Sequence, residues 1–176
     1  MLQVLFALAA LLPLATTLPA FALHYAVPLS LKAMVDDGDC TLPAAYTVRG
    51  IQEVIMNYNS AKPTVSLTFS YDDASTSLHT FCQYNSTSVN VGPPGLTARW
   101  ACDNPTVQFI YELEDSKLTL IERACPEENL TRHFEASDSI PLKDNLRCSL
   151  QGANIVCSTD PTSYSKNFSS LQPSPY

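Results

Sequence analysis

The sequence predicts an all-β fold, a small antiparallel β-barrel or sandwich stapled by about three disulfides. Short stretches alternate apolar and polar residues with the period of two that is typical of half-buried strands. Turn-forming residues separate these stretches, and none shows a sustained helical period with caps. All six cysteines lie downstream of an apolar leader, so the thiols are expected to meet an oxidising compartment and pair. Many short strands at close spacing indicate a sandwich or a barrel.

Residues 1–22 form the predicted signal peptide. Their apolar run, 4–14, is shorter than the roughly 20 residues that span a bilayer, which argues against a membrane anchor. The small-x-small pattern Ala20-Phe21-Ala22 indicates cleavage before Leu23. We therefore expect a secreted, extracellular protein with no membrane attachment after cleavage.

The remaining roughly 150 residues suit a single domain. We expect an extended lead-in over 23–39, which ends in an acidic run, and a β domain over 40–157. Ser, Thr and Pro dominate 158–176, and this composition predicts a disordered tail that could carry O-glycans.

The first two expected strands differ in regularity. Residues 46–58 are long and mostly β-compatible, with a break or bulge expected at Gly50. The alternative for 51–56 is one or two helical turns. In contrast, 65–71 alternates apolar and polar residues strictly, which predicts a half-buried strand.

The following strands are separated by clear turn chemistry. Residues 78–84 and 98–102 are predicted strands, and the Gly-Pro-Pro-Gly segment at 92–95 can continue neither. The alternation over 107–113 predicts another strand, and a tight connection suggests a hairpin with 117–124.

The spacing of Cys148 and Cys157 favours a disulfide across a hairpin. If Gly152-Ala153 is a two-residue turn, glycine in the first position suits type II′. The two cysteines then face each other as a non-hydrogen-bonded pair, with Cα atoms roughly 4.5 Å apart, within disulfide range. A longer irregular loop is the alternative.

The other four cysteines suggest two further bridges. Cys82 and Cys102 each end a predicted strand, and their pairing would close a loop of about 20 residues, worth roughly 3 kcal/mol. Cys40 and Cys125 would then join the lead-in to the end of the 117–124 strand. The even number of cysteines does not by itself choose this connectivity.

The surface chemistry limits the classes of partner. A formal net charge of −7 argues against nucleic acid and anionic membranes, which bind basic patches. Three N-x-S/T sequons behind a leader predict glycosylation at Asn85, Asn129 and Asn167 in surface loops.

Searches for catalytic motifs predict no enzyme. The sequence has no Gly-x-Ser-x-Gly elbow, no His-Glu-x-x-His and no glycine-rich phosphate loop. His79 is expected on the exposed face of a strand and His133 in a loop. An alternative is copper chelation by an N-terminal His24 together with His79, which would require cleavage one residue later at an unfavourable site. We expect no catalytic residue, no metal site and no cofactor.

The carboxylates are expected to serve turns and solvation. Asp72 and Asp73 follow a strand, where aspartate favours a turn. The acidic run at 36–39 lacks the ligand spacing of a calcium loop and is read as a solvated linker. Three further acids mark an expected hairpin tip: Glu112, Glu114 and Asp115. Paired acids for glycoside hydrolysis remain an alternative that needs distances.

Several aromatic residues offer a possible binding surface for sugars or phenols: Tyr58, Tyr71, Tyr84, Trp100 and Tyr111. Strand phase puts Tyr71 and Tyr111 on the faces of Phe69 and Phe109, which favours the core. We expect Trp100 to pack on the disulfide of Cys102. The core interpretation is preferred for each residue, although one or two exceptions would suffice for a ligand site.

The pattern from Cys40 to Cys157 resembles the fungal Alt a 1-like secreted proteins. The order of the cysteines and the Trp-x-Cys motif at 100–102 carry the resemblance, with Tyr-Thr-Val at 46–48 and strand patterning in support. The resemblance implies a compact β-barrel without established catalytic activity. The disulfide pairing of that family agrees with the Cys82–Cys102 and Cys148–Cys157 bridges suggested above. Cys125 departs from the pattern of the founding allergen and gives Cys40 an intramolecular partner, which puts a disulfide-linked dimer in doubt.

The expected function is therefore that of a secreted, non-catalytic interaction protein of the fungal effector, elicitor or allergen class. The alternative is a cell-wall module that binds carbohydrate or a small phenolic ligand, and a secreted enzyme ranks third. The expected partner is an unidentified host protein or small ligand, and the expected state is a monomer or weak homodimer.

Overall fold

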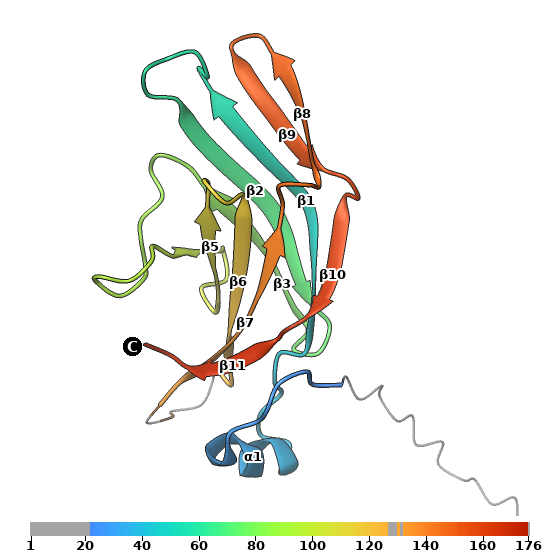
Figure 1. Ribbon diagram of the computed structural model, residues 1–176. Helices are drawn as coiled ribbons and strands as arrows, with labels where there is room; N and C mark the ends of the chain where they lie inside the picture. Colours follow the sequence, from blue (N-terminus) through green and yellow to red (C-terminus); the bar gives the residue numbers. More distant parts are fainter. Residues whose placement is uncertain (1–21, 127–129, 131, 176) are drawn as a thin grey trace, which may run out of the picture.

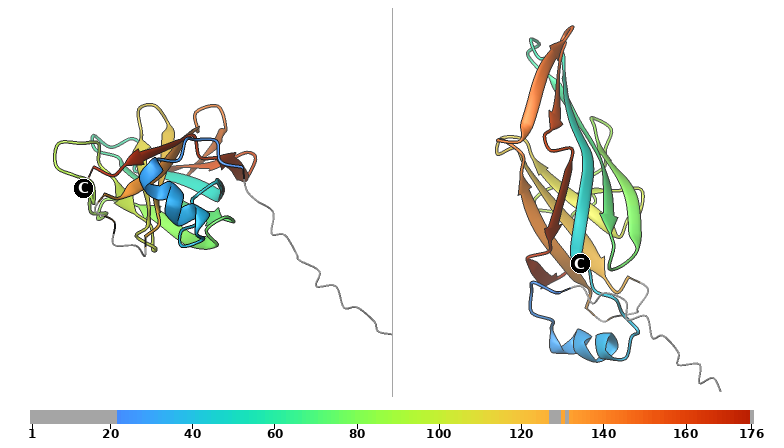
Figure 2. Two further views of the ribbon diagram at one scale, coloured as in Figure 1. Left: turned by 90° about the horizontal axis from the view of Figure 1, so that it is seen from below. Right: turned by 90° about the vertical axis from the view of Figure 1, so that its right-hand side faces the viewer.

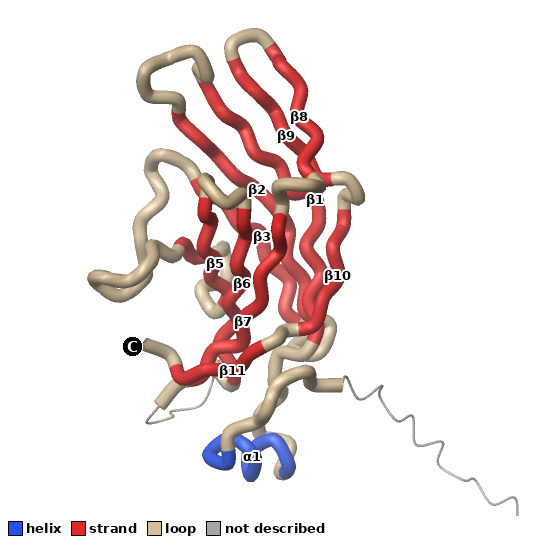
Figure 3. The backbone as a smooth tube through the Cα atoms, viewed as in Figure 1, coloured by secondary structure: helices blue, strands red, loops and turns tan. Residues whose placement is uncertain are grey.

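The computed structural model describes residues 22–126, 130 and 132–175. Two antiparallel sheets, of six and five strands, pack face to face as a sandwich (Figures 1 and 3). The sheets do not close into a barrel, so the sandwich is the confirmed form of the predicted all-β fold. The predicted signal peptide, apart from Ala22, and Asn129 lie outside the described residues.

The structure assigns eleven strands and one helix within the described ranges. In chain order these are α1 (Leu29–Asp36), β1 (Ala45–Met56), β2 (Thr64–Asp73), β3 (Leu78–Tyr84), β4 (Trp100–Ala101), β5 (Val107–Glu112), β6 (Lys117–Ala124), β7 (Phe134–Pro141), β8 (Leu146–Gln151), β9 (Asn154–Thr159), β10 (Ser163–Asn167) and β11 (Ser170–Pro173).

The six-stranded sheet is organised around β1, and its order is β3-β2-β1-β9-β8 with β10 also paired to β1. The expected irregularity at Gly50 is a bulge: the register with β2 shifts between Arg49 and Gln52, and Gly50 has φ 61°. Before the bulge β1 pairs with β10, and after it β1 pairs with β9 along the same edge. The bulge thus divides one long strand between two partners.

The five-stranded sheet has the order β11-β7-β6-β5-β4. The hairpin of β5 and β6 is present as predicted, with Glu112 opposite Lys117. Strand β7 has no counterpart among the sequence-based strands. Its inward face carries Asp138 between Ala136 and Ile140, so the apolar alternation that identifies a strand is interrupted.

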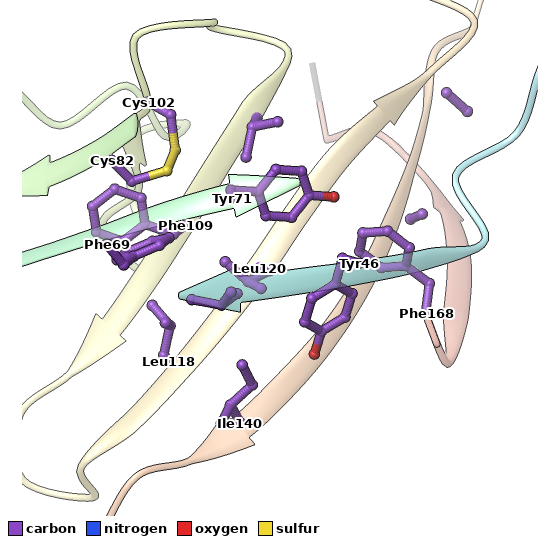
Figure 4. Packing of buried hydrophobic residues seen from close by; sticks show 14 of the residues in the cluster. Tyr46, Phe69, Tyr71, Cys82, Cys102, Phe109, Leu118, Leu120, Ile140 and Phe168 are labelled. Carbon is purple, nitrogen blue, oxygen red and sulfur yellow. A yellow bond between two sulfur atoms is a disulfide. The ribbon is translucent and has the colours of Figure 1, made fainter. Parts of the chain in front are cut away.

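Aromatic rings fill the space between the sheets (Figure 4). The fully buried side chains include Tyr46, Tyr71 and Phe168, and Phe69 meets Phe109 edge-on with ring centroids 5.1 Å apart. Edge-to-face contact is a favoured geometry for such pairs. Both sheets contribute to one core, because the apolar residues of each strand alternate inward as the sequence predicts.

The lead-in is not wholly extended, which corrects one expectation. Leu31 of α1 is buried, with Met34 and Val35 partly buried on the same helical face. Gly38 has φ 81°, and its N–H and that of Asp39 bond back to the last turn in a Schellman motif. The acidic run is therefore a helix terminus. Figure 2 shows α1 lying across one end of the sandwich.

The predicted disordered tail is also corrected. Strand β10 pairs with β1, and β11 pairs with β7, so the C-terminal segment adds a strand to each sheet. Phe168, between the two strands, is completely buried against Tyr46. The single large apolar side chain anchors a segment whose composition otherwise resembles a disordered one.

The structure contains the three expected disulfides, Cys40–Cys125, Cys82–Cys102 and Cys148–Cys157. Cys148 and Cys157 face each other across the β8–β9 hairpin with Cα atoms 4.0 Å apart. Gly152 has φ 64° and Ala153 does not have a positive φ, as in a type II′ turn. The hairpin argument is confirmed.

Candidate ligand-binding sites

One candidate site is an aromatic hollow of about 280 Å³ at the rim of the core. It is lined by Pro63, Thr64, Val65, Tyr84, Ser86, Tyr111 and Leu113. Tyr84 ends β3 and Tyr111 comes from β5, so both sheets contribute a ring. Behind the wall, Trp100 packs against Tyr84 at 4.5 Å between ring centroids and against Phe109 at 5.9 Å. These contacts fix the orientation of the Tyr84 ring.

A buried carboxyl lies next to this aromatic hollow. Glu53 points inward from β1 between Leu67 of β2 and Cys157 of β9, and it is 4% exposed. Burial raises the Glu53 pKa, and the neighbouring Tyr111 hydroxyl partly offsets this rise. Burial and the nearby carboxyl likewise raise the pKa of Tyr111. The hydroxyl of Tyr111 therefore stays protonated.

Of the five aromatic residues proposed from the sequence, the structure brings three together: Tyr84, Trp100 and Tyr111. Tyr71 is in the core as expected, and Tyr58 lies apart in the β1–β2 turn, half-exposed. Tyr111 is both 6% exposed and part of the hollow's lining, so core and ligand site overlap at this residue. Trp100 makes ring contacts with Tyr84 and Phe109 and packs against the core cluster that includes Cys82 and Cys102, while its direct packing on their disulfide stays a prediction.

A second candidate site, the acidic hollow, has a volume of about 370 Å³ and lies beside the Cys40–Cys125 disulfide. It is lined by Asp39, Cys40, Thr41, Thr76, Ser77, Leu78, Asn104, Thr106, Glu122, Cys125 and Pro126. The lead-in, the β2–β3 and β4–β5 connections and the end of β6 all contribute. The disulfide links the lead-in covalently to the residue that follows β6, so it helps to hold the wall formed by 39–41.

Glu122 is the central charged group of the acidic hollow. It points inward from β6, between Val107 and Ala136, and is 1% exposed. The Tyr71 hydroxyl donates to Oε2 and Thr76 Oγ1 donates to Oε1 at 2.8 Å. Burial, with a contribution from the charge of Asp73, raises the Glu122 pKa to about 7, although the two hydrogen bonds lower it.

Sequence reasoning missed Glu122, although a signal was present. Glu122 is in phase with Leu118 and Leu120 along β6, so strand periodicity alone places it on the core face. A charged residue in that phase is a candidate functional group, because burying an unpaired carboxylate is costly.

Asp72 and Asp73 are neighbours in the chain, but Asp73 is buried and Asp72 is partly exposed. Asp73 is buried, and its Oδ1 accepts hydrogen bonds from the N–H of Ser75 at 2.6 Å and of Thr76 at 3.3 Å, as its expected turn role requires. Burial nevertheless raises the Asp73 pKa. Asp72 points the other way and pairs with Arg49 at 2.7 Å and with His79.

The three histidines lie on three different segments of the described part of the chain. The side chain of His79 is 73% exposed on β3. His133 precedes β7, where its carbonyl accepts the Ser174 N–H at 2.8 Å, and His24 lies exposed in the lead-in. Over residues 22–126, 130 and 132–175, no group of three or more His, Cys, Asp or Glu side chains is arranged to hold a metal ion.

The three acids expected at the tip of the β5–β6 hairpin are located at that tip. Glu112 pairs with Lys117 at 2.8 Å across the β5–β6 hairpin, while Glu114 and Asp115 are exposed in the turn. None of the three lines either hollow.

Two of the three sequons fall within the described residues. Asn85 is half-exposed, and its Oδ1 accepts from Thr87 N at 2.9 Å and Thr87 Oγ1 at 2.7 Å. Ser86, the middle residue of this sequon, lines the aromatic hollow, so a glycan on Asn85 would stand at its mouth. Asn167 is exposed at the end of β10 rather than in a loop.

No protein-family model matches the chain, and no curated protein matches its sequence. Among the described residues, no helix has the length and apolar character needed to cross a membrane. Three disulfides in a small β domain are consistent with an extracellular protein.

Proposed function

We propose that the protein is a secreted, non-catalytic binding protein whose aromatic hollow holds one ring of a small ligand, either a sugar or a phenol. The observation that carries this proposal is that two tyrosines, Tyr84 from one sheet and Tyr111 from the other, line one hollow of about 280 Å³. Aromatic faces of this kind stack on sugar and phenol rings and bury much of their apolar surface.

Polar groups around the aromatic hollow would orient such a ligand. The hydroxyls of Thr64 and Ser86 line it. None of the described lining residues is a His, Cys, Asp or Glu, so the wall contains neither an activated nucleophile nor a general base. This chemistry supports binding over turnover.

The fluorescence of Trp100 tests the proposal directly, because it is the only tryptophan and packs on Tyr84. We expect catechol or a soluble chitin or glucan oligomer to change its emission in a saturable manner. Tyr84→Leu should weaken the response at least tenfold, whereas the matched variant Tyr58→Leu, in the distant β1–β2 turn, should not. If none of these probes produces a saturable response, or if the two variants behave alike, the proposal is wrong.

An interaction with a host protein is the second candidate, in line with the resemblance to effectors and elicitors. The observation in its favour is an apolar row across the six-stranded sheet, near the β1–β2 and β8–β9 turns. Register places Val65, Ile55, Ile155 and Leu150 side by side across β2, β1, β9 and β8. Leu150 is 61% exposed, and a row of this kind suits the apolar centre of a protein interface.

A charge placed on this row separates the two candidates. Members of the family that the sequence resembles include proteins that provoke plant defence. We therefore expect Leu150→Lys to abolish a defence response, measured as an oxidative burst in leaf tissue infiltrated with the purified protein. Leu29→Lys is the matched control, since Leu29 is 86% exposed on α1 at the opposite end of the molecule (Figure 1). Equal responses from both variants would exclude this surface as the host-protein interface.

A further inference from the structure

Glu122 differs from two other acids in the fold because no cation accompanies it. Glu135 is paired with Arg99 at 2.7 Å, and Asp138 is paired with Lys166 at 2.9 Å. Within the described residues, the partners of Glu122 are two hydroxyls, and the nearby charge is that of another acid, Asp73. A positive group close to this carboxylate would stabilise its ionised form, because burial and the charge of Asp73 both disfavour that form.

We propose that the acidic hollow binds a small organic cation, a primary ammonium compound that also carries hydroxyl groups. Among the described lining residues the charged side chains are Asp39 at the rim and Glu122 at the floor, both acidic. Between them lie side chains that exchange hydrogen bonds with hydroxyls and N–H groups: Thr41, Thr76, Ser77, Asn104 and Thr106. The volume of about 370 Å³ suits an amino polyol or amino sugar.

Thr76 provides the contact between ligand and acid. Its hydroxyl donates to Glu122 Oε1 and therefore has lone pairs free to accept from an ammonium N–H in the hollow. The ligand charge can thus be placed close to a nearly inaccessible carboxylate without rearranging the core. The low local dielectric strengthens this attraction relative to water.

Other ligand classes fit the acidic hollow less well. An anion would face two carboxyl groups, and among the described residues no group of three or more His, Cys, Asp or Glu side chains is arranged here to hold a metal ion. A neutral polyol could use the hydroxyls but would leave Glu122 uncompensated. Only a cation satisfies both the hydroxyls and the acid.

Binding of a cation is linked to the proton on Glu122. The groups that face this carboxyl are Tyr71 and Asp73 from β2, and Tyr25 from the lead-in lies within range of the charges of both acids. None of them supplies a positive charge, so Glu122 holds its proton below about pH 7 in the ligand-free protein, and binding of a cation there requires that proton to leave. Affinity should therefore rise with pH, by up to about tenfold per unit below the Glu122 pKa of about 7, and level off above it.

The test compares serinol, an amino diol, with its neutral isostere glycerol. Both are titrated into the isotope-labelled secreted protein, and amide shifts around Thr76, Asn104 and Glu122 are followed by NMR. Above the Glu122 pKa we expect serinol to bind roughly ten- to hundredfold more tightly than glycerol. Glu122→Gln should remove this preference and its pH dependence, while Glu114→Gln, the same charge change in an exposed turn, should retain both.

The results of this experiment are independent of ligand binding in the aromatic hollow, because the two hollows have different lining residues and are tested with different ligands. Equal affinities for serinol and glycerol, or a serinol preference that survives Glu122→Gln, would overturn the assignment of a cation site. Absence of saturable shifts with serinol would overturn it as well. If Glu122→Gln misfolds, Thr76→Val serves instead, because it removes the accepting hydroxyl at a half-exposed position and should weaken serinol binding in the same way.

Discussion

The hydroxyl of Tyr46, on β1 of the six-stranded sheet, donates to Asp138 Oδ2 on β7 of the five-stranded sheet at 2.7 Å. Asp138 also receives Lys166 Nζ at 2.9 Å and the Ser169 hydroxyl at 2.7 Å. Burial by itself would raise the Asp138 pKa, but these three donors lower it overall. One carboxylate therefore joins both sheets to the C-terminal segment through the core.

We expect Tyr46→Phe to destabilise the fold by about 1–3 kcal/mol, because it leaves a partly buried carboxylate without one of its donors. Urea unfolding of the secreted protein measures this loss. Thr47→Val is the control: it removes an exposed 2.8 Å hydrogen bond to Ser165 on the neighbouring strand and should cost no more than about 0.5 kcal/mol. Similar losses for the two variants would mean that the inter-sheet bond contributes little.

Phe168→Ala should cost about 3–5 kcal/mol, since it empties a fully buried ring site against Tyr46. Leu29→Ala, at a position 86% exposed, should change the stability by no more than about 0.5 kcal/mol. Thermal and urea unfolding of both variants provide the comparison. A negligible effect of Phe168→Ala would mean that residues 158–176 contribute little to the stability of the fold.

The three disulfides should contribute unequally to stability, according to the loops they close. Replacing both cysteines of each pair by serine should cost about 4.5 kcal/mol for Cys40–Cys125, about 3 for Cys82–Cys102 and about 2.5 for Cys148–Cys157. The order follows from sequence separations of 85, 20 and 9 residues. Unfolding in denaturant of the three double variants gives the ranking, and a reversed order would show that native-state contacts outweigh chain entropy.

Stability should decrease as the pH rises from about 4.5 to about 7. Glu122 has its pKa raised from 4.5 to about 7 in the fold, so the folded state holds a proton that the unfolded chain releases. Its stabilising contribution is complete below the unfolded pKa and is lost as the pH passes the folded value. The raised pKa values of Glu53 and Asp73 act in the same direction.

The loss attributable to Glu122 is about 3 kcal/mol, because each pH unit between folded and unfolded pKa values is worth about 1.4 kcal/mol. Melting temperatures recorded across this pH range measure it. Glu122→Gln should flatten the profile and Glu114→Gln should leave it unchanged. A stability that increases over the same interval would contradict the burial of an uncompensated acid.

Local sequence patterns predict the strands and their pairing correctly where the stabilising contacts join residues that are close in sequence. Strands β3 and β6 begin and end where the alternation does, and the turn at Gly152 predicts the register that brings Cys148 to Cys157. In such hairpins, turn geometry sets the pairing, and pairing sets the disulfide.

The elements that sequence reasoning missed depend on partners that are far away in the chain. β10 and β11 are short and polar and exist because β1 and β7 offer open edges and the core accommodates Phe168. The helix α1 has only eight residues and is held by Leu31 against the end of the sandwich. The intrinsic helix or strand propensity of such short segments is too weak to predict them from the sequence.

The sequence by itself determined the all-β class, the bulge at Gly50 and the disulfide of the β8–β9 hairpin, because each follows from the local geometry of a few neighbouring residues. Tertiary structure alone decided that Glu122, Thr76 and Asp39 share one hollow and that Tyr84 and Tyr111 share another. Strand phase tells which side chains point inward. Which of them meet depends on how two sheets stack, and that is decided by contacts between residues distant in the chain.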